Sequence, residues 1–354
     1  MKVLLVKMSS LGDVFHALPA VQDAYQQIPN LEIHWLVEEA FADIPSWHPA
    51  VKKVIPIAWR RWRKNLTCAD VRAEMKAFYR ELRNCEYDIV LDAQCLIKSA
   101  AVTRMAKGPR YGLDKQSCRE PLAAMAYQFP QAVAKGQHAI PRVRQLLSQV
   151  LNYQLPNTFS YGIDKSRWSR PDVEGEYWLF LHGTTWDTKL WPETYWLELA
   201  DMVVKSGRKV VLPWGNEEEK ARAERIAAGI EGVVVLPKMG LNALNAYLAY
   251  AQGVVGVDTG LSHVVAALEV PSVSIYGATD AVLTGVLGPN AEVLSSDYDC
   301  APCLNKQCNH PSRNDGLDAQ PPCYRSISAQ RVFEALTLKV EQSVSIIARN
   351  NRGA

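Results

Sequence analysis

The chain has 354 residues, of which 48% are hydrophobic and 21% are charged, and its formal net charge at pH 7 is +2. This composition excludes a largely disordered chain, and at about 150 residues per domain the length predicts two domains. The near-neutral charge excludes a protein that binds nucleic acid over a whole face, so a basic function must reside in a local cluster.

The N-terminus argues against secretion. Only four apolar residues separate Lys2 from Lys7, which is too short for the apolar segment of a signal peptide. No run of about 18 apolar residues occurs, so no transmembrane helix is expected. We therefore expect a cytoplasmic protein, in which the eight cysteines stay reduced.

Strand and helix patterns alternate along the first part of the chain. Strands are predicted at 2–6, 31–37, 51–55 and 87–91, and helices at 14–25 and 69–83. The same alternation returns later, with strands at 177–181, 209–212, 233–236, 254–257 and 272–276, and helices at 192–205, 241–251 and 262–268. This order predicts two doubly wound α/β domains, each around a mostly parallel sheet.

The pattern is interrupted near residues 155–172, where Pro156 and Pro171 occur, and we place the domains at 1–165 and 166–327. Residues 297–325 are rich in Cys, Pro, Asn and Asp and predict an irregular loop. A closing helix is expected at 329–346, and a frayed tail at 348–354.

Ligands of doubly wound sheets bind beyond the carboxyl ends of the strands, so the loops there are the candidate sites. No Gly-x-Gly-x-x-Gly or Gly-x-x-x-x-Gly-Lys-Ser/Thr signature occurs, which disfavours a nicotinamide enzyme and a P-loop NTPase. In the first such loop, Ser10 and Asp13 have two interpretations. They are helix-capping residues, or Asp13 is a carboxylate that takes a proton from an acceptor hydroxyl.

Four cations follow in the segment 60–64, namely Arg60, Arg61, Arg63 and Lys64. They form either a solvated face or an anion site, which Arg119 would join if the fold brings it near. The loop with Thr184, Thr185 and Lys189 is either a pyrophosphate cradle or an ordinary capped loop. In the segment 258–263, a Thr-Gly turn offers free N–H groups at a helix start, whereas a lone histidine is more often a packed residue.

Cysteines form one cluster in the sequence, Cys300, Cys303, Cys308 and Cys323. The first pair has the spacing of a zinc site, but the others match no common zinc module, so zinc, a disulfide and reduced thiols all stay open. The remaining cysteines are predicted to be packing residues: Cys68, Cys85, Cys95 and Cys118.

Together these segments resemble the bacterial lipopolysaccharide heptosyltransferases, glycosyltransferase family 9. Residues 7–19 resemble the family's N-terminal signature and residues 258–263 its C-terminal signature. The segments 35–39, 44–48, 60–64, 92–94 and 212–215 resemble the members that add the first heptose to the Kdo of the inner core. The resemblance covers about residues 1–295. It implies a GT-B fold, in which two Rossmann-like domains face a cleft and a C-terminal helix, here 328–347, packs back on the first domain.

The resemblance implies inverting transfer of L-glycero-D-manno-heptose from ADP-heptose to Kdo2-lipid A, without a metal or other cofactor. Asp13 would be the general base. Lys189 and the amides of 259–262 would offset charge on the leaving ADP, Glu219 would bind the ribose, and Met239 would pack on the adenine. The implied donor contacts are Thr184, Thr185, Lys189, Glu219, Met239, Asp258, Thr259, Gly260, Leu261, Ser262 and His263. The implied acceptor contacts are Ser10, Gly12, Arg60, Arg61, Arg63, Lys64 and Arg119.

Because lipid A sits in a membrane leaflet, peripheral contact with the cytoplasmic face of the inner membrane is also expected, and nucleic acid is not. Two features depart from the family pattern. Cys95 stands where related sequences have Gly, and the cysteine-rich stretch looks more like relatives that add the second heptose. Two alternatives therefore stay open: a heptosyltransferase acting on another core acceptor, and a non-catalytic module that binds a sugar nucleotide or lipid A.

Overall fold

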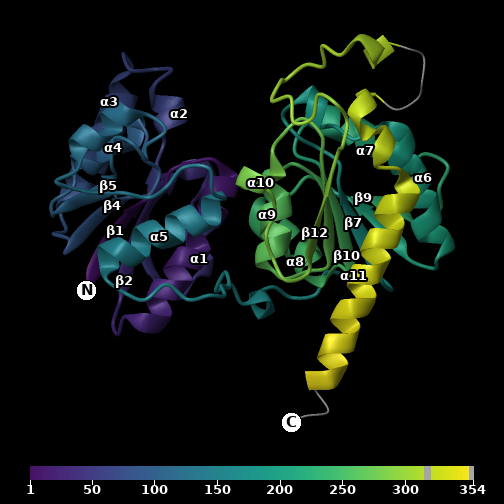
Figure 1. Cartoon of the computed structure of the whole chain (residues 1–354), viewed down its shortest axis with the longest axis horizontal. Helices are drawn as coiled ribbons and strands as arrows, with labels where there is room; N and C mark the ends of the chain where they lie inside the picture. Colours follow the sequence, from purple (N-terminus) through teal and green to yellow (C-terminus); the bar gives the residue numbers. More distant parts are fainter. Residues whose placement is uncertain (315–319, 351–354) are drawn as a thin grey trace. The chain divides into compact units, whose positions relative to one another are not determined.

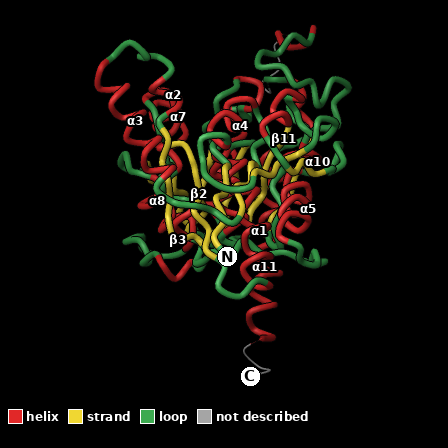
Figure 2. The backbone as a smooth tube through the Cα atoms, turned by 90° about the vertical axis from the view of Figure 1, so that its left-hand side faces the viewer, coloured by secondary structure: helices red, strands yellow, loops and turns green. Residues whose placement is uncertain are grey.

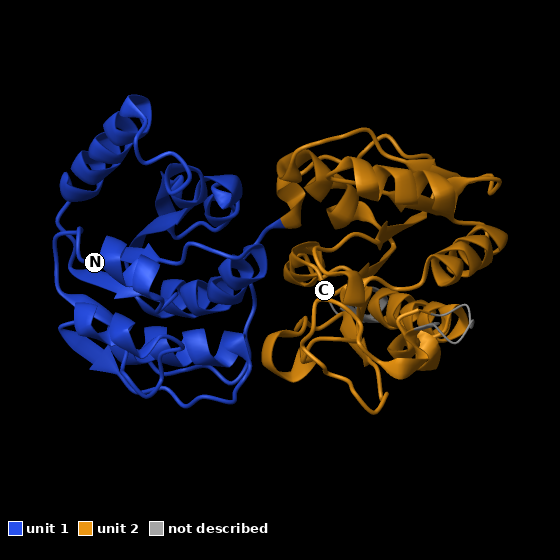
Figure 3. Ribbon diagram, turned by 90° about the horizontal axis from the view of Figure 1, so that it is seen from above, with its two compact units in different colours: residues 1–164 blue, residues 165–354 orange. Residues whose placement is uncertain are grey.

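The computed structural model describes residues 1–314 and 320–350. The chain divides into two compact units, Met1–Asp164 and Lys165–Ala354, shown in different colours in Figure 3. This division falls one residue before the predicted boundary. Each unit has its own parallel sheet, and Figure 2 shows how strands and helices alternate along the chain.

The first unit contains a six-stranded sheet in the order β3-β2-β1-β4-β5-β6, in which neighbouring strands pair in parallel. Its strands are β1 (Lys2–Val6), β2 (Glu32–Glu38), β3 (Val51–Ile57), β4 (Ile89–Asp92), β5 (Arg110–Leu113) and β6 (Phe129–Gln131). Its helices are α1 (Leu11–Gln27), α2 (Trp59–Trp62), α3 (Ala69–Arg83), α4 (Ile97–Thr103) and α5 (Ala139–Leu151). Helices α1 and α5 pack side by side (Figure 1).

The second unit repeats this topology, with a parallel sheet in the order β12-β11-β10-β7-β8-β9. Its strands are β7 (Tyr177–Leu181), β8 (Lys209–Leu212), β9 (Val233–Val235), β10 (Gly253–Val257), β11 (Ser272–Tyr276) and β12 (Ala291–Ser295). Its helices are α6 (Glu193–Lys205), α7 (Glu217–Ala227), α8 (Leu241–Tyr250), α9 (Gly260–Ala267), α10 (Ala281–Thr284) and α11 (Ala329–Asn350). The prediction of two doubly wound α/β units is confirmed.

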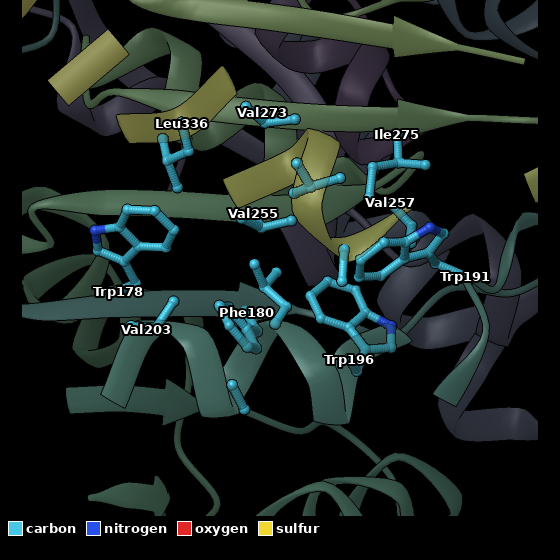
Figure 4. Close-up of a cluster of buried hydrophobic side chains, with 14 of the residues drawn as sticks. Trp178, Phe180, Trp191, Trp196, Val203, Val255, Val257, Val273, Ile275 and Leu336 are labelled. Atoms are coloured by element: carbon cyan, nitrogen blue, oxygen red, sulfur yellow. The ribbon is translucent and has the colours of Figure 1, made fainter. Parts of the chain in front are cut away.

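The central strands are short apolar runs because helices cover both faces of a parallel sheet. Strand β7 is buried at every position, and so are β10 and β11. In the second unit, large aromatic side chains fill the space between sheet and helices, among them Trp178, Phe180, Trp191 and Trp196 (Figure 4). This core fixes the strand ends that carry the candidate residues.

The C-terminal helix α11 packs within the second unit, and its predicted packing on the first domain stays a prediction. Its apolar stripe, Val332, Leu336 and Val340, is buried in the core of the second unit, and the helix packs against α6 and β10. The side chain of Leu336 lies directly over Gly253, where a Cβ would come within 2.9 Å of it. The helix continues to Asn350, beyond the predicted end at 346, and residues 351–354 lie outside the described residues.

Several elements between residues 93 and 151, together with α7 and β12, were not predicted, because their apolar patterns are short or weak. The cysteine-rich stretch has neither long helix nor strand where it is described, as expected, with single turns of 3-10 helix at Pro311–Asn314 and Pro322–Ser326. Residues 315–319 of that stretch lie outside the described residues. Within 1–314 and 320–350, no helix has the length and apolar character needed to cross a membrane.

Candidate functional site

The order of strands reverses at one point in each sheet, between β1 and β4 in the first unit and between β7 and β10 in the second. Ligands of doubly wound sheets bind outside the carboxyl ends of the strands at such a point. The loops there are 7–10 and 93–96 in the first unit, and 182–192 and 258–259 in the second. They contain most of the residues singled out in the sequence.

Asp13 lies in the first turn of α1, directly after the loop that follows β1. Its Oδ2 accepts hydrogen bonds from the Ser10 backbone N–H at 2.7 Å and from the Ser10 hydroxyl at 3.0 Å. The two interpretations of the sequence are therefore compatible, because the carboxylate caps the helix while 38% of its side chain stays exposed. Gly12, which has no side chain, precedes it in the same turn and leaves this surface open.

Two lysines beside Asp13 were not predicted as site residues from the sequence. Lys7 Nζ lies 3.7 Å from Asp13 Oδ1 and donates to the Ala93 carbonyl. Lys98 Nζ donates to the Ser9 hydroxyl at 2.8 Å. Burial lowers the pKa of Lys98, repulsion from Arg60 lowers it further, and Asp13 acts in the opposite direction. A lysine at the end of β1 and another at the start of α4 were the signals available in the sequence.

Gln94 joins the two loops at this switch point. Its Oε1 accepts hydrogen bonds from the backbone N–H groups of Met8 and Ser9, so the loop after β4 holds the loop that presents Asp13. Cys95, the departure from the family pattern, follows in a left-handed conformation at φ 54°. It is buried, as predicted, and its Sγ donates to the Asp92 carbonyl.

The basic segment 60–64 divides into two parts. Arg61 pairs with Glu39 at 3.1 Å and with Glu74 at 2.8 Å. Its guanidinium is thus paired with two carboxylates, on η1 (Glu39–Phe41) and α3, while its assignment as an acceptor contact stays a prediction. The sequence did not show this, because neither glutamate is a near neighbour of Arg61 in the chain.

The other cations of this segment face solvent. Arg60 lies over the Phe41 ring at 5.3 Å and, together with Arg63, is close enough to Lys98 to lower its pKa. Within 1–314 and 320–350, no carboxylate lies within ion-pair distance of Arg63 or Lys64. Arg119 is also exposed, just before the 3-10 helix η3 (Pro121–Ala126). Arg60 and Arg63 thus place positive charge near Lys98, on which the charge of Asp13 also acts.

The second unit has a pocket of about 220 Å³ at its own switch point. Four of the predicted donor contacts line it: Glu219, Met239, Thr259 and Leu261. His182, Trp214 and Leu244 line it as well and were not predicted as contacts. The strand ends of β7, β8 and β10 and the helices α7 and α8 thus assemble residues that are far apart in the sequence.

Glu219 is positioned by two glycines. Its Oε2 accepts from the Gly215 N–H at 2.7 Å, and its carboxyl lies over Gly183, where an added Cβ would come within 2.6 Å. The side chain therefore folds over the end of β7, which only glycine permits at position 183. A carboxylate fixed in this way at the pocket wall is suited to accept hydrogen bonds from a diol such as that of ribose.

Lys189 and Asp258 meet beside the pocket. Lys189 Nζ lies 2.7 Å from Asp258 Oδ2, and its ammonium also lies 4.5 Å from the centre of the Trp186 ring. Thr279 donates to the same carboxylate, and the Thr184 hydroxyl donates to the Asp258 carbonyl. Thr185, in the same loop, is exposed. The loops after β7 and β10 are therefore joined by a mostly buried charged pair next to Thr259, which lines the pocket.

The remaining predicted donor contacts lie at the start of α9. Gly260 begins the helix, so its amide points out of the first turn. Ser262 does not have a free side chain or amide, since its hydroxyl donates to the Val257 carbonyl and its N–H to the Thr259 carbonyl. His263 is buried among packed residues. Thr259 and Leu261 of this turn line the pocket, whereas the side chains of Ser262 and His263 are buried, and their assignment as donor contacts stays a prediction.

The cysteines are all free thiols. Cys300, Cys303 and Cys308 are near enough to Cys323 to raise its pKa, although burial is the larger cause of its rise to about 12. In the part of the chain that the structure describes, no three Cys, His, Asp or Glu side chains are arranged to hold a metal ion. Of the other four, Cys95 and Cys118 are buried and Cys85 packs against the core of the first unit, as predicted, whereas Cys68 is exposed, so the prediction is wrong for Cys68.

Comparisons with known proteins show which family the chain is similar to. The model of glycosyltransferase family 9 (heptosyltransferase) matches residues 75–313. The chain is 48% identical to lipopolysaccharide heptosyltransferase 1 of Pseudomonas aeruginosa over 96% of this chain and 99% of that protein. It is also similar to the solved structure of E. coli heptosyltransferase WaaC with ADP, with 49% identity and a TM-score of 0.81 over 84% of this chain and 93% of that one. The same enzyme with ADP-2-deoxy-2-fluoro heptose gives 48% identity and a TM-score of 0.79 over the same shares.

Proposed function

The chain belongs to glycosyltransferase family 9, the heptosyltransferases, and we propose that it transfers L-glycero-D-manno-heptose from ADP-heptose to the Kdo of Kdo2-lipid A. It is a glycosyltransferase of the GT-B class that acts in the synthesis of the lipopolysaccharide core. The choice of Kdo2-lipid A as acceptor rests on the name and identity of the Pseudomonas aeruginosa relative and on the resemblance of several segments to members that use it.

The reaction is a single displacement at the anomeric carbon. A Kdo hydroxyl oxygen forms the new bond to that carbon, its proton passes to the Asp13 carboxylate, and the bond to ADP breaks with the electron pair leaving on the diphosphate. Attack from the face opposite ADP inverts the anomeric configuration. One base is sufficient, in contrast to the two carboxylates of a glycosidase.

Asp13 is well placed for the role of base. Ser10 holds one of its carboxylate oxygens, and the other is nearest to Lys7 at 3.7 Å, too long for a strong hydrogen bond. Both contacts orient the carboxylate while its exposed fraction lets a hydroxyl approach. The basic residues around it, Lys7 and Lys98, suit an acceptor that carries a carboxylate, as Kdo does.

The pocket of the second unit suits ADP-heptose. Met239 and Leu244 offer apolar surface to an adenine, and the Glu219 carboxylate accepts from ribose hydroxyls. Lys189 neutralises the charge that builds on the diphosphate as its bond to the sugar breaks. Lys189 also pairs with Asp258, so a bound diphosphate would compete with this carboxylate for the ammonium.

The observation that carries the proposal is the partly exposed Asp13 carboxylate, held by Ser10 beside two lysines at the switch point of the first unit. The test is incubation with ADP-heptose and heptose-free Kdo2-lipid A, with release of ADP and the mass of the lipid as readouts. We expect equal amounts of ADP and of lipid that has gained one heptose. Heat of binding in a calorimeter without ADP release would instead indicate a non-catalytic binding module.

A further inference from the structure

We propose that the first unit docks on an anionic lipid bilayer through three exposed apolar side chains, Ile97, Leu122 and Met125, together with the cations Lys98 and Arg119. These five residues are called the docking surface below. The inference rests on the proposed function, because a lipid acceptor gives the enzyme a reason to meet a bilayer, and it assigns the surface that does so.

The apolar part of the docking surface is unusually exposed. Leu122 and Met125 are 66% and 78% exposed, the highest values among large apolar side chains of the first unit, and Ile97 is 51% exposed. Leu122 and Met125 lie on the short helix η3, which packs against α4, where Ile97 is the first residue. Leu122 and Met125 are three residues apart on η3 and therefore share one face of that helix, and Ile97 lies on the helix that packs against it. Exposed apolar side chains on adjacent elements favour an interaction site.

The two elements are fixed to each other by a polar contact as well. The Ile97 backbone N–H donates to Glu120 Oε2 at 2.7 Å. The carboxylate of Glu120, just before η3, is thus bonded to the N-terminus of α4. Arg119, which precedes Glu120 in the chain, is exposed. The fold therefore holds the apolar residues on a rigid base and leaves cations at their edge.

The charges favour an anionic bilayer as the occupant. Lys98 follows Ile97 and Arg119 precedes η3, so a cation adjoins each apolar element. Lys98 is in turn close to Arg60 and Arg63, which extends the positive potential toward the exposed segment 60–64. Apolar side chains beside basic residues are the features with which peripheral proteins bind the interface of anionic membranes, and each basic residue near such a surface adds to binding.

The docking surface is also continuous with the candidate catalytic residue. Lys98 donates to Ser9, which is bonded to Ser10, and Ser10 donates to Asp13. Ile97 is the neighbour of Lys98 in the chain. Because Ile97 directly precedes Lys98, we place the headgroup of a lipid in the bound bilayer near the loop that positions Asp13. This geometry would let the enzyme act on its acceptor without removing the acyl chains from the bilayer.

The test is co-sedimentation with vesicles of phosphatidylethanolamine, with or without phosphatidylglycerol. We expect the wild-type chain to bind the vesicles that contain phosphatidylglycerol, to bind the neutral ones weakly, and to be released by added salt. The double variant Leu122→Asn, Met125→Asn is expected to bind at least about tenfold more weakly, because two apolar side chains no longer enter the interface. Val344→Asn, at an apolar position of α11 that is 59% exposed, is the matched control and is expected to bind like wild type.

A second readout separates docking from catalysis. With an acceptor stripped of its acyl chains, the double variant is expected to keep wild-type kcat and KM, whereas with acceptor in vesicles its turnover falls in parallel with binding. Absence of wild-type binding to anionic vesicles, unchanged binding of the double variant, an equal loss in Val344→Asn, or lost turnover of the stripped acceptor would each overturn the assignment. Failure of wild type on every acceptor would refute the proposed function instead, while vesicle binding still reports on the surface.

Discussion

Replacement of Asp13 by Asn and by Ala separates its two roles. The carboxylate accepts two hydrogen bonds from Ser10 and thereby caps α1. An Asn side chain retains an acceptor oxygen at this position, whereas Ala retains none. Asp13→Asn should therefore fold like wild type, and Asp13→Ala should lose about 1 kcal/mol of stability, the usual contribution of a helix cap. In thermal melting this corresponds to a decrease of roughly 2–4 °C for a unit of this size.

Both variants lose the base. Proton transfer to a positioned carboxylate contributes about 10²- to 10⁴-fold to a rate, so kcat for heptose transfer should fall by that factor in each of them. The assay is release of ADP under saturating ADP-heptose and acceptor, alongside calorimetric binding of ADP-heptose, which should be unchanged because the donor pocket lies in the second unit. Near-normal turnover of Asp13→Asn would refute the assignment of the base, and a fall seen in Asp13→Ala alone would assign the residue to capping.

Three further predictions follow from individual contacts. Lys189→Met removes the cation that faces Asp258 and the leaving diphosphate, so kcat should fall by about 10²-fold, measured by ADP release. Arg61→Met should lower the melting temperature, because Glu39 and Glu74 lose their partner. Arg63→Met should leave the melting temperature unchanged and raise KM for the acceptor. A lower melting temperature in Arg63→Met, with none in Arg61→Met, would contradict the division of the basic segment. Burial, with a smaller contribution from a nearby arginine, lowers the pKa of His182 to about 4, so the unfolded chain binds a proton between about pH 6.5 and 4 that the folded one does not. His182 alone should contribute a fall of up to about 3 kcal/mol through that range, in addition to that of His48, whose pKa burial also lowers to about 4, so urea unfolding should show a smaller decrease in His182→Gln.

The alternation of strands and helices was predictable because parallel strands are buried on both faces and are therefore nearly continuous apolar runs. Strands 177–181, 209–212 and 272–276 have the predicted limits, as does helix 69–83. By contrast, β5 and β6 are short, and β6 contains Pro130 and exposed residues, so no apolar run marks it. Helix α7 has a low apolar content and contacts the core chiefly through Ala223 and Ile226.

The positions of the candidate residues were also predictable, since a loop that follows a buried strand must emerge at the ligand-binding edge of the sheet. Their partners were not. The pairing of Arg61 with Glu39 and Glu74 depends on the packing of three elements, and so does the proximity of Lys98 to Ser9. Ser262 shows the same limit, because a serine at a helix start is equally compatible with ligand contact and with a buried bond to Val257. Whether a side chain is available to a ligand depends on its contacts with distant parts of the chain. These contacts cannot be predicted from the spacing of residues in the sequence.

The proposed activity is heptose transfer to Kdo2-lipid A. The most direct measurement is the ratio of kcat/KM for ADP-heptose-dependent transfer to heptose-free Kdo2-lipid A and to the same lipid already carrying one heptose, with the products identified by mass. We predict efficient addition of one heptose to the heptose-free acceptor and little or none to the other. Preferential use of the monoheptosylated acceptor would contradict the account and identify a different core acceptor.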